Sequence, residues 1–445
     1  MRTPICDFVK EYQKSGASRL HMPGHKGVTL LGFEDMDITE IAGADSLYEA
    51  SGIIRESEKN ASELFGCDTF YSTEGSSQCI RAMMHLVCLC AKEKGEKPRV
   101  LAARNCHKTF VSAASMLDYE VEWLWKDNVS HLSCNIDAAE LEKYFSKAEK
   151  KPTVLYLTSP DYLGQVADIE AISKVCKKYG VLLCVDNAHG AYLRFLEKSH
   201  HPIDLGADIC CDSAHKTLPC LTGGAYLHIS SDAPSIFSQN AKEALALFGS
   251  TSPSYLILQS LDKVNEYIAN EYVERLLKLC QRLADLKKRL CNAGFSFLGD
   301  EPTKLTLECK KHGYFGFEMA DVLREKGIEC EFSDRDYLVL MFTPEISDGE
   351  IERLENALVS IKKRTPIYEK SPCAAVSEAK MSIREAMMSL SENLPVRECE
   401  GRVLARLGVS CPPAVPIGIP GEVITLEMIE VLEYYGRETC AVIKK

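Results

Sequence analysis

The sequence predicts an α/β protein built on a mostly parallel sheet. From about residue 60 to 230, short apolar runs alternate with stretches in which apolar residues recur at helical spacing. This alternation is typical of a sheet covered by helices on both faces. A chain of 445 residues is too long for one simple core, so two or three domains are expected. Ligands of such sheets gather at the carboxyl ends of the strands, so candidate site residues are sought there first.

Buried strands are predicted where short apolar runs lie between turn residues. There are five such runs, at 99–103, 153–158, 181–186, 208–212 and 224–229. Helices are predicted between them at 74–95 and 168–180, the first with an apolar stripe through Met83 and Val87 that is ordinary core packing. A long helical stretch at 253–292 follows.

The remainder of the chain divides into smaller parts. A small α/β unit is expected near residues 295–363, and residues 365–372 resemble a linker. The last part contains a proline-dense loop at 410–422. The predicted division is an N-terminal segment, a large domain, a small α/β domain and a C-terminal domain, at 1–60, 61–292, 293–365 and 366–445.

Composition excludes several classes of function. The formal charge of −12, without a cluster of Lys or Arg, argues against a nucleic-acid surface. The N-terminus has no apolar signal core, and no segment has the length of a transmembrane helix. None of the twenty cysteines is spaced C-x-x-C, so no metal site is predicted and reduced thiols in a cytoplasm are expected.

Two turns that follow predicted strands carry unusual polar residues. In "STEGSSQ" at 72–78, Gly75 allows a turn, and Ser76 and Ser77 place hydroxyls and N–H groups at a helix N-terminus that can bind a phosphate. The alternative is plain N-capping by serine. His107 follows the strand at 99–103, where a hydrogen-bonded structural role is the alternative to catalysis.

Two further strand ends carry a carboxylate and an amine. Asp186 ends the strand at 181–186, where a buried carboxylate must be paired or hydrogen-bonded. Ser213, His215 and Lys216 follow the strand at 208–212. The alternative for Lys216 is an ordinary loop lysine that points into water.

One ligand accounts for all four strand ends. Pyridoxal 5′-phosphate (PLP) needs a phosphate cup, an aspartate for its ring nitrogen, a flat group over its ring and a lysine for its aldehyde. A lysine joined covalently to the cofactor is no longer a simple buried ammonium, which removes the cost of burying Lys216.

The chain resembles the bacterial ornithine/lysine/arginine decarboxylases, which have the aspartate-aminotransferase-like fold (fold type I) of PLP enzymes. The matching motifs occur in family order and span nearly the whole chain. They are "HMPGHKG" at 21–27, "DITEIAGADSLYEASGIIRESE" at 37–58, "TEGSSQ" at 73–78, "NCHKT" at 105–109, "TSPDYLGQVADI" at 158–169, "VDNAHGAY" at 185–192, "DSAHKTLP" at 212–219, "TSPSY" at 251–255 and "PPAVPIGIPGE" at 412–422. The resemblance is to the short form of the family, so no N-terminal wing domain is expected.

The resemblance implies a role for each matching residue. Lys216 matches the lysine that holds the cofactor aldehyde, Asp186 the partner of the ring nitrogen, and His107 the histidine stacked on the ring. Ala188 matches the small residue on the opposite face of the ring. The phosphate ligands correspond to the turn at Gly75 with Ser76, Ser77, Ser213 and His215. The fold also implies a homodimer or a larger homo-oligomer with the active site at the interface, so that Ser252 reaches the phosphate of the neighbouring subunit.

Several positions depart from the family pattern. Glu74 stands where the family usually has Asn, Asn187 where it commonly has Glu, and Tyr192 where it often has His. The run "LTGGA", with Gly223 and Gly224, replaces "LTQTA". These positions are expected near the substrate and leave its identity open.

The resemblance implies decarboxylation of lysine, ornithine or arginine to the corresponding amine, which feeds polyamine metabolism. An aminotransferase would clamp the substrate carboxylate with an arginine, and the predicted strand at 337–343 has none, although Arg335 precedes it. Glu422 is the candidate for binding the distal cation of the substrate, against the alternative of a solvated loop glutamate. A PLP aminotransferase, another lyase acting on a different amino acid, or a non-catalytic PLP-binding protein remain alternatives.

Overall fold

The computed structural model describes residues 1–125, 130–372, 376–408 and 413–445. The chain forms two compact units. The first unit consists of residues 1–98 and 169–276, and the second of residues 99–168 and 277–445. The two units are defined by how the chain packs and do not coincide with the four predicted domains. The four domains stay a prediction.

The first unit is built around four strands. They are β1 (Asp68–Ser72), β7 (Ala225–Ile229), β6 (Ile209–Asp212) and β5 (Leu182–Asp186), in this order across the sheet. Strands β5 and β6 run parallel, with Asp186 opposite Cys211, whereas β7 runs antiparallel to both β6 and β1. The three strands predicted in this unit are confirmed. Strand β1 was not predicted, because "DTFYS" has no apolar run.

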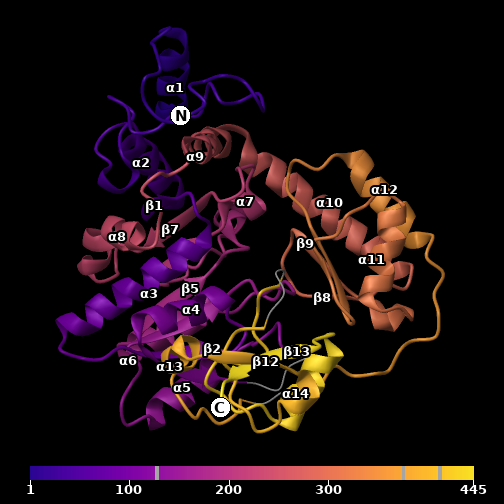
Figure 1. Cartoon of the computed structure of the whole chain (residues 1–445). Helices are drawn as coiled ribbons and strands as arrows, with labels where there is room; N and C mark the ends of the chain where they lie inside the picture. The colour runs from indigo at the N-terminus through magenta and orange to yellow at the C-terminus, as the bar shows by residue number, and fades with distance from the viewer. Residues whose placement is uncertain (126–129, 373–375, 409–412) are drawn as a thin grey trace. The chain divides into compact units, whose positions relative to one another are not determined.

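Helices cover the strands of the first unit. Helix α3 (Ser76–Glu93) packs against β1, β6 and β7 and lies side by side with α8 (Ser235–Leu247), as Figure 1 shows. Helices α1 (Pro4–Lys14), α2 (Ile53–Phe65) and α9 (Tyr255–Tyr267) contact one another, and α6 (Ile169–Tyr179) packs on β5. Short helical segments complete the unit: η1 (Leu47–Glu49), η2 (Ala191–Phe195) and α7 (Ala214–Thr217).

A buried aspartate fastens the N-terminal helix. Asp262 on α9 accepts hydrogen bonds from the backbone N–H groups of Ile5 and Cys6, both at 3.0 Å, and from the hydroxyl of Ser57 at 2.6 Å. The first N–H groups of a helix have no partner within it. Asp262 therefore supplies from another helix the acceptor that α1 needs at its N-terminus.

The long helical stretch predicted at 253–292 is confirmed. It consists of α9, a π-helical turn η3 (Ile268–Tyr272) and α10 (Val273–Asn292). Apolar residues recur along α10 and include Leu279, Leu283 and Leu286, which are buried.

The second unit contains three parallel strands and a small antiparallel sheet. The parallel strands are β4 (Val154–Thr158), β2 (Arg99–Ala103) and β3 (Glu120–Leu124), with helices α4 (Lys108–Leu117) and α5 (Ala138–Lys147) between them in sequence. The small sheet has the order β10 (Phe332–Ser333), β11 (Tyr337–Met341), β9 (Lys304–Glu308), β8 (Phe297–Leu298). The helices of this part, η4 (Cys309–His312), α11 (Gly316–Glu325) and α12 (Asp348–Val359), follow in chain order, and their apolar residues share one core with α10.

The C-terminal part of the second unit has its own small core. It contains α13 (Ile383–Met388), β12 (Ser391–Pro395), η5 (Val396–Glu398), α14 (Leu426–Tyr434) and β13 (Thr439–Ile443), with β12 and β13 antiparallel. Residues 410–412 of the proline-dense loop lie outside the described residues. Across the described ranges, no helix is both long and apolar enough to cross a membrane, and all eighteen cysteines are free.

Asp262→Ala is expected to lower the free energy of unfolding of the apo-protein by about 2–4 kcal/mol, because it leaves buried donors without an acceptor. Urea denaturation followed by circular dichroism measures this change. Asp232→Ala is the control, since Asp232 forms an exposed ion pair with Lys177, and it is expected to cost at most about 1 kcal/mol. Equal losses in the two variants would contradict the anchoring role of Asp262.

Candidate functional site

The turn between β1 and α3 is shaped for an anion. Gly75 is the N-cap of α3 at φ +71°, and its N–H donates to the carbonyl of Gly223 at 2.7 Å. Ser76 and Ser77 thus occupy the first helical turn of an 18-residue helix and are partly exposed. A glycine N-cap has no side chain to cap with, so N-capping by serine does not explain these residues. The N–H groups at a helix N-terminus favour a bound phosphate.

The hydroxyl of Ser72 closes this turn from within. It accepts the Glu74 N–H at 3.1 Å and donates to the side-chain oxygen of Gln78 at 2.5 Å. The amide of Gln78 in turn donates to the Tyr48 hydroxyl and the Leu245 carbonyl, each at 2.8 Å. The loop is therefore fixed before any ligand arrives.

Gly223 and Gly224 are required by close packing around the turn. A Cβ on Gly223, which has φ +102°, would lie 2.8 Å from the carbonyl oxygen of Thr73. A Cβ on Gly224 would lie 2.2 Å from Cys220 Sγ. This departure from the family pattern therefore has a structural reason in this chain.

The residues after β6 meet the turn after β1. The Ser213 hydroxyl donates to the Ser76 hydroxyl at 2.8 Å, so two predicted phosphate ligands lie together. His215 Nδ1 donates to the Gly224 carbonyl at 3.0 Å. Burial, and to a smaller extent the nearby Lys216 ammonium, lower the pKa of His215 below its usual value. A neutral His215 has no proton on Nε2, so it must take up a proton before it can donate from that atom to a phosphate.

Lys216 faces a histidine that was not predicted as a site residue. Its Nζ lies 3.0 Å from Nε2 of His189, a residue that is only 6% exposed. The solvent-exposed loop lysine, which was the alternative, does not describe this half-buried side chain. His189 lies in the motif "VDNAHGAY", three residues after Asp186, and this proximity in sequence was the available signal.

Asp186 lies at the buried end of β5. It is 2% exposed, accepts the Ala188 N–H at 3.2 Å and lies 3.8 Å from Cys211 Sγ. Because β5 and β6 are parallel neighbours, Asp186 and the segment from Ser213 to Lys216 emerge at the same edge of the sheet.

The remaining departures from the family pattern, Asn187, Tyr192 and Glu74, lie in the first unit. Asn187 and Tyr192 are buried, at 0% and 1% exposure. Glu74 accepts a hydrogen bond from the backbone N–H of Ser250. Ser252 is exposed and donates its N–H to Ser250 Oγ at 3.1 Å, and its contact with a neighbouring subunit stays a prediction.

Two predicted site residues belong to the second unit. His107 is the N-cap of α4, where Nδ1 contacts the Thr109 hydroxyl at 2.9 Å and accepts the Thr109 N–H at 3.2 Å. Glu422 is 2% exposed and forms a buried ion pair with Arg104 at 2.7 Å. The solvated-loop alternative for Glu422 is therefore wrong, and its role in binding a substrate cation stays a prediction.

The donor set of the first unit fits PLP. It offers N–H groups and hydroxyls for a phosphate, a buried carboxylate for a ring nitrogen and a lysine amine for an aldehyde. The residues that would hold the group there are Ser76, Ser77, Asp186, Ala188, Ser213, His215 and Lys216.

Comparisons with known proteins agree with this donor set. Residues 3–298 match a family model described as "Orn/Lys/Arg decarboxylase, major domain", and residues 362–439 match the C-terminal domain of the same family. The arginine decarboxylase of Bacillus subtilis is 29% identical, over 96% of this chain and 92% of its own length.

Solved structures show the same fold. Lysine decarboxylase A from Pseudomonas aeruginosa superposes with a TM-score of 0.80 at 18% identity, over 99% of this chain and 80% of that one. A cysteine desulfurase from Thermococcus onnurineus gives 0.55 at 16% identity, over 81% and 91%. The predicted aspartate-aminotransferase-like fold of type I is confirmed.

Gly223→Ala is expected to weaken the phosphate turn. The left-handed backbone costs about 1–2 kcal/mol with a Cβ, and contact with the Thr73 carbonyl adds about 1–3 kcal/mol. Thermal unfolding and the dissociation constant of added PLP measure the two effects. Gly95→Ala is the matched control, because Gly95 has φ +72° with open space around it, and it should leave PLP binding unchanged. Equal PLP affinity in both variants would contradict the packing role.

Proposed function

The chain belongs to the Orn/Lys/Arg decarboxylase family, and we propose that it is a PLP-dependent decarboxylase that converts a basic amino acid to the corresponding amine. Enzymes of this family and of this fold type depend on PLP. The observation that carries the proposal is the placement of Lys216 with His189 at the edge of the sheet where Asp186 ends the neighbouring strand.

The predicted PLP-binding residues of the first unit each have a role in this reaction. The N-terminus of α3, with Ser76 and Ser213, anchors the phosphate. Asp186 presents a buried carboxylate that would keep a proton on the ring nitrogen of bound PLP. When bound, PLP supplies an electron sink for the carbanion left after a bond to the substrate Cα breaks.

His189 is assigned to the amine of Lys216. Lys216 must lose its ammonium proton to act as a nucleophile. Nε2 of His189, at 3.0 Å from Nζ, is within reach to accept that proton and to return it. This assignment adds His189 to the predicted catalytic residues Lys216, Asp186 and His107. We propose that His107 stacks on the ring of the cofactor.

Arg335 argues against an aminotransferase. Its guanidinium forms two hydrogen bonds with Glu369, at 3.0 and 3.3 Å, and its Cζ lies 4.5 Å from the centre of the Phe315 ring. An arginine bound to a carboxylate and stacked on an aromatic ring is committed within its own unit. It is therefore a poor clamp for a substrate carboxylate, and decarboxylation is the reaction we favour.

Arginine is the first substrate to test, because the relatives at 27–29% identity include several named arginine decarboxylases. Lysine and ornithine are the alternatives.

We further propose that the amine product serves polyamine metabolism and that the enzyme is cytoplasmic. The eighteen free cysteines in the described ranges support a reducing compartment.

An exposed apolar loop supports a homodimer. The carboxylate of Glu34 accepts the backbone N–H groups of Leu30 and Leu31, at 2.9 and 2.5 Å, and those of the two residues that follow. This organised loop displays Leu30 at 79% exposure and Leu31 at 77%. Apolar side chains held out in an ordered loop are typical of a surface that a partner covers. We propose a second copy of this chain as that partner.

The reaction is tested by the visible spectrum and by CO2 release. Wild-type protein with PLP is expected to show a yellow absorption band that Lys216→Ala lacks, because the band requires the lysine amine. Wild type should release CO2 from arginine, lysine or ornithine, and Lys216→Ala should lose at least about 10³-fold in rate. The absence of CO2 from all three, with a normal band, would contradict the decarboxylase proposal. A keto-acid product would indicate the aminotransferase.

The dimer is tested by light scattering coupled to size-exclusion chromatography. Leu30→Glu combined with Leu31→Glu is expected to convert a dimer to a monomer, because each carboxylate would be buried without a partner. Val273→Glu is the control, as Val273 is 40% exposed on a helix and lies outside this loop. A wild-type protein that is already monomeric would refute the proposed surface.

A further inference from the structure

A buried polar cluster adjoins the predicted cofactor-binding residues Asp186 and Ser213. Its centre is Asp212, the last residue of β6, surrounded by Asn187, His201 and His228. All four side chains have 0% exposure. The mechanism proposed above does not use any of them.

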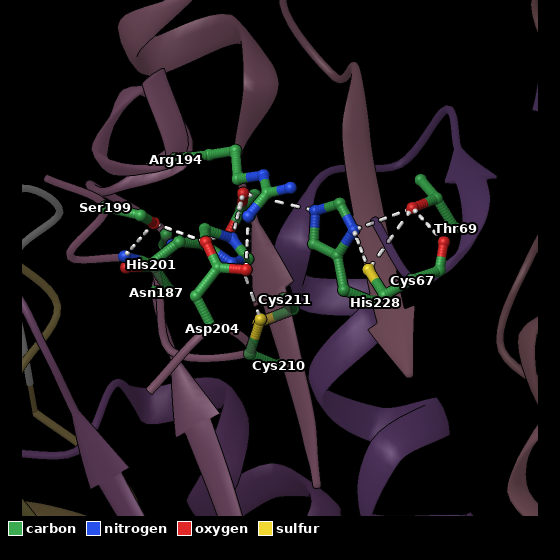
Figure 2. Close-up of polar contacts among 12 residues, drawn as sticks. Cys67, Thr69, Asn187, Arg194, Ser199, His201, Asp204, Cys210, Cys211 and His228 are labelled. Atoms are coloured by element: carbon green, nitrogen blue, oxygen red, sulfur yellow. Dashed lines mark hydrogen bonds and ion pairs between the residues drawn. The ribbon is translucent and has the colours of Figure 1, made fainter. Parts of the chain in front are cut away.

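Asp212 accepts three N–H groups. Its Oδ1 accepts the side-chain amide of Asn187 at 2.6 Å, and its Oδ2 lies 3.1 Å from His201 Nε2 and 3.2 Å from His228 Nε2. Figure 2 shows His228 with Thr69 and Cys67 beside it, where Nδ1 is 2.9 Å from the Thr69 hydroxyl.

These contacts keep the carboxylate ionised although it is buried. Burial opposes the charge of Asp212, but the two histidines outweigh it and hold the pKa of that carboxyl well below its usual range. Burial lowers the pKa of His228, so this ring donates to Asp212 as a neutral imidazole near pH 7. The buried carboxylate of Asp212 therefore carries a negative charge that its N–H donors stabilise.

The cluster is bonded to both cofactor-binding segments. Asn187 lies between Asp186 and Ala188 in the chain, and Asp212 directly precedes Ser213. The side-chain hydrogen bond of 2.6 Å and the bond from Asn187 N–H to the Cys211 carbonyl, at 3.0 Å, join the two strand ends. A shift of Asp212 would thus move Asp186 and Ser213 together.

The residue types at positions 187 and 212 determine which of the two side chains carries the buried negative charge. Similar decarboxylases commonly have Glu at the position of Asn187, whereas this chain has an amide there and a carboxylate at Asp212. In this chain the amide at position 187 donates to the carboxylate at position 212, which also accepts from His201 and His228.

We propose that Asp212, through Asn187, is a positioning residue that orients Asp186 toward the ring nitrogen of the cofactor. This inference rests on the proposed PLP dependence of the site. Asp212 does not touch the cofactor and acts only through its neighbours.

A metal ion is the competing explanation for part of this cluster. Donor atoms of His201, Cys210 and Asp212 lie within 4.8 Å of one another, and Cys210 Sγ is 3.9 Å from His201 Nε2. The Nε2–Oδ2 distance of 3.1 Å between His201 and Asp212 is that of an ordinary hydrogen bond, which satisfies both atoms without an ion. Elemental analysis of the purified holoenzyme distinguishes the two explanations.

The test exchanges the charge and the amide. Asn187→Asp places two carboxylates in contact in a buried site and is expected to raise the dissociation constant of PLP by about tenfold or more. The double variant Asn187→Asp/Asp212→Asn restores one carboxylate and one amide. The carbonyl of the amide introduced at position 212 accepts from both histidines, and its NH2 group donates to the carboxylate introduced at position 187. Affinity is therefore expected within about threefold of wild type.

A second ligand separates positioning of Asp186 from general loosening of the site. It is a carbocyclic analogue of PLP in which a C–H group replaces the ring nitrogen. Wild type is expected to prefer PLP over this analogue, because only PLP offers a nitrogen to Asp186. Asn187→Asp should reduce this preference about tenfold, and the double variant should restore it.

A buried aspartate elsewhere in the same unit provides the matched control. Asp262→Asn perturbs the anchor of α1 and is expected to lower the melting temperature without changing the preference for PLP. Binding is measured by titration of apo-protein, so the outcome does not depend on catalytic turnover.

Three results would overturn the proposal. They are an unchanged preference in Asn187→Asp, additive losses in the double variant, and one equivalent of bound metal lost on His201→Ala. Failure of the proposed function has a different signature, namely normal PLP binding without CO2 release. Wild-type protein that does not bind PLP at all would overturn both.

Discussion

The parallel pairing of β5 with β6 is the constraint on which the first unit depends. It places Asp186 opposite Cys211 and directs both strand ends to one edge of the sheet. Because β7 runs antiparallel to β6 and β1, the start of β7 and the end of β1 arrive at that same edge. Four polar segments thereby converge on a sheet whose interior is apolar. Burying the carboxylates of Asp186 and Asp212 is the cost of this arrangement, and hydrogen-bond donors from the backbone, asparagine and histidine offset it.

The same edge of the sheet also requires glycines, because the backbone segments there pack closely against one another. The N–H of Gly75 reaches the carbonyl of Gly223 at 2.7 Å, and the carbonyl of Gly224 receives His215 Nδ1 at 3.0 Å. Side chains at Gly223 or Gly224 would collide with the Thr73 carbonyl or with Cys220 Sγ. The turn between β1 and α3, His215 and the segment that contains Lys216 therefore form one packed assembly. A side chain added at Gly223 or Gly224 would shift the backbone of this assembly.

Local signals explain what could be predicted from the sequence. The five apolar runs are strands. Asp186 is the last residue of one of them, and Ser213 and Lys216 follow another, so they could be found because burial and strand ends are properties of short segments. Contacts between distant residues could not be predicted in this way. Asn187 and Asp212 are 25 residues apart, and Arg104 and Glu422 are 318 apart. The first pair depends on strand register and the second on the packing of the second unit. The spacing of apolar residues in the sequence predicts neither. His189 was within reach, since it lies in a motif already singled out.

The choice of reaction depends on which charges are still available to a substrate. Arg335 is bound to Glu369, and Asp212 is shared among three N–H donors, so neither offers its charge to a new ligand. Glu422 differs from them, because Arg104 and the Ile419 N–H use only its Oε2, and its Oε1 has no hydrogen-bond partner among the described residues. A buried carboxylate oxygen without a donor is unfavourable, and a guanidinium or ammonium group would satisfy it. The unit that contains Glu422 thus retains a buried carboxylate oxygen suited to the distal cation of a basic amino acid, while Arg335 in the same unit is already bound to Glu369. Both facts favour a decarboxylase of basic amino acids over an aminotransferase.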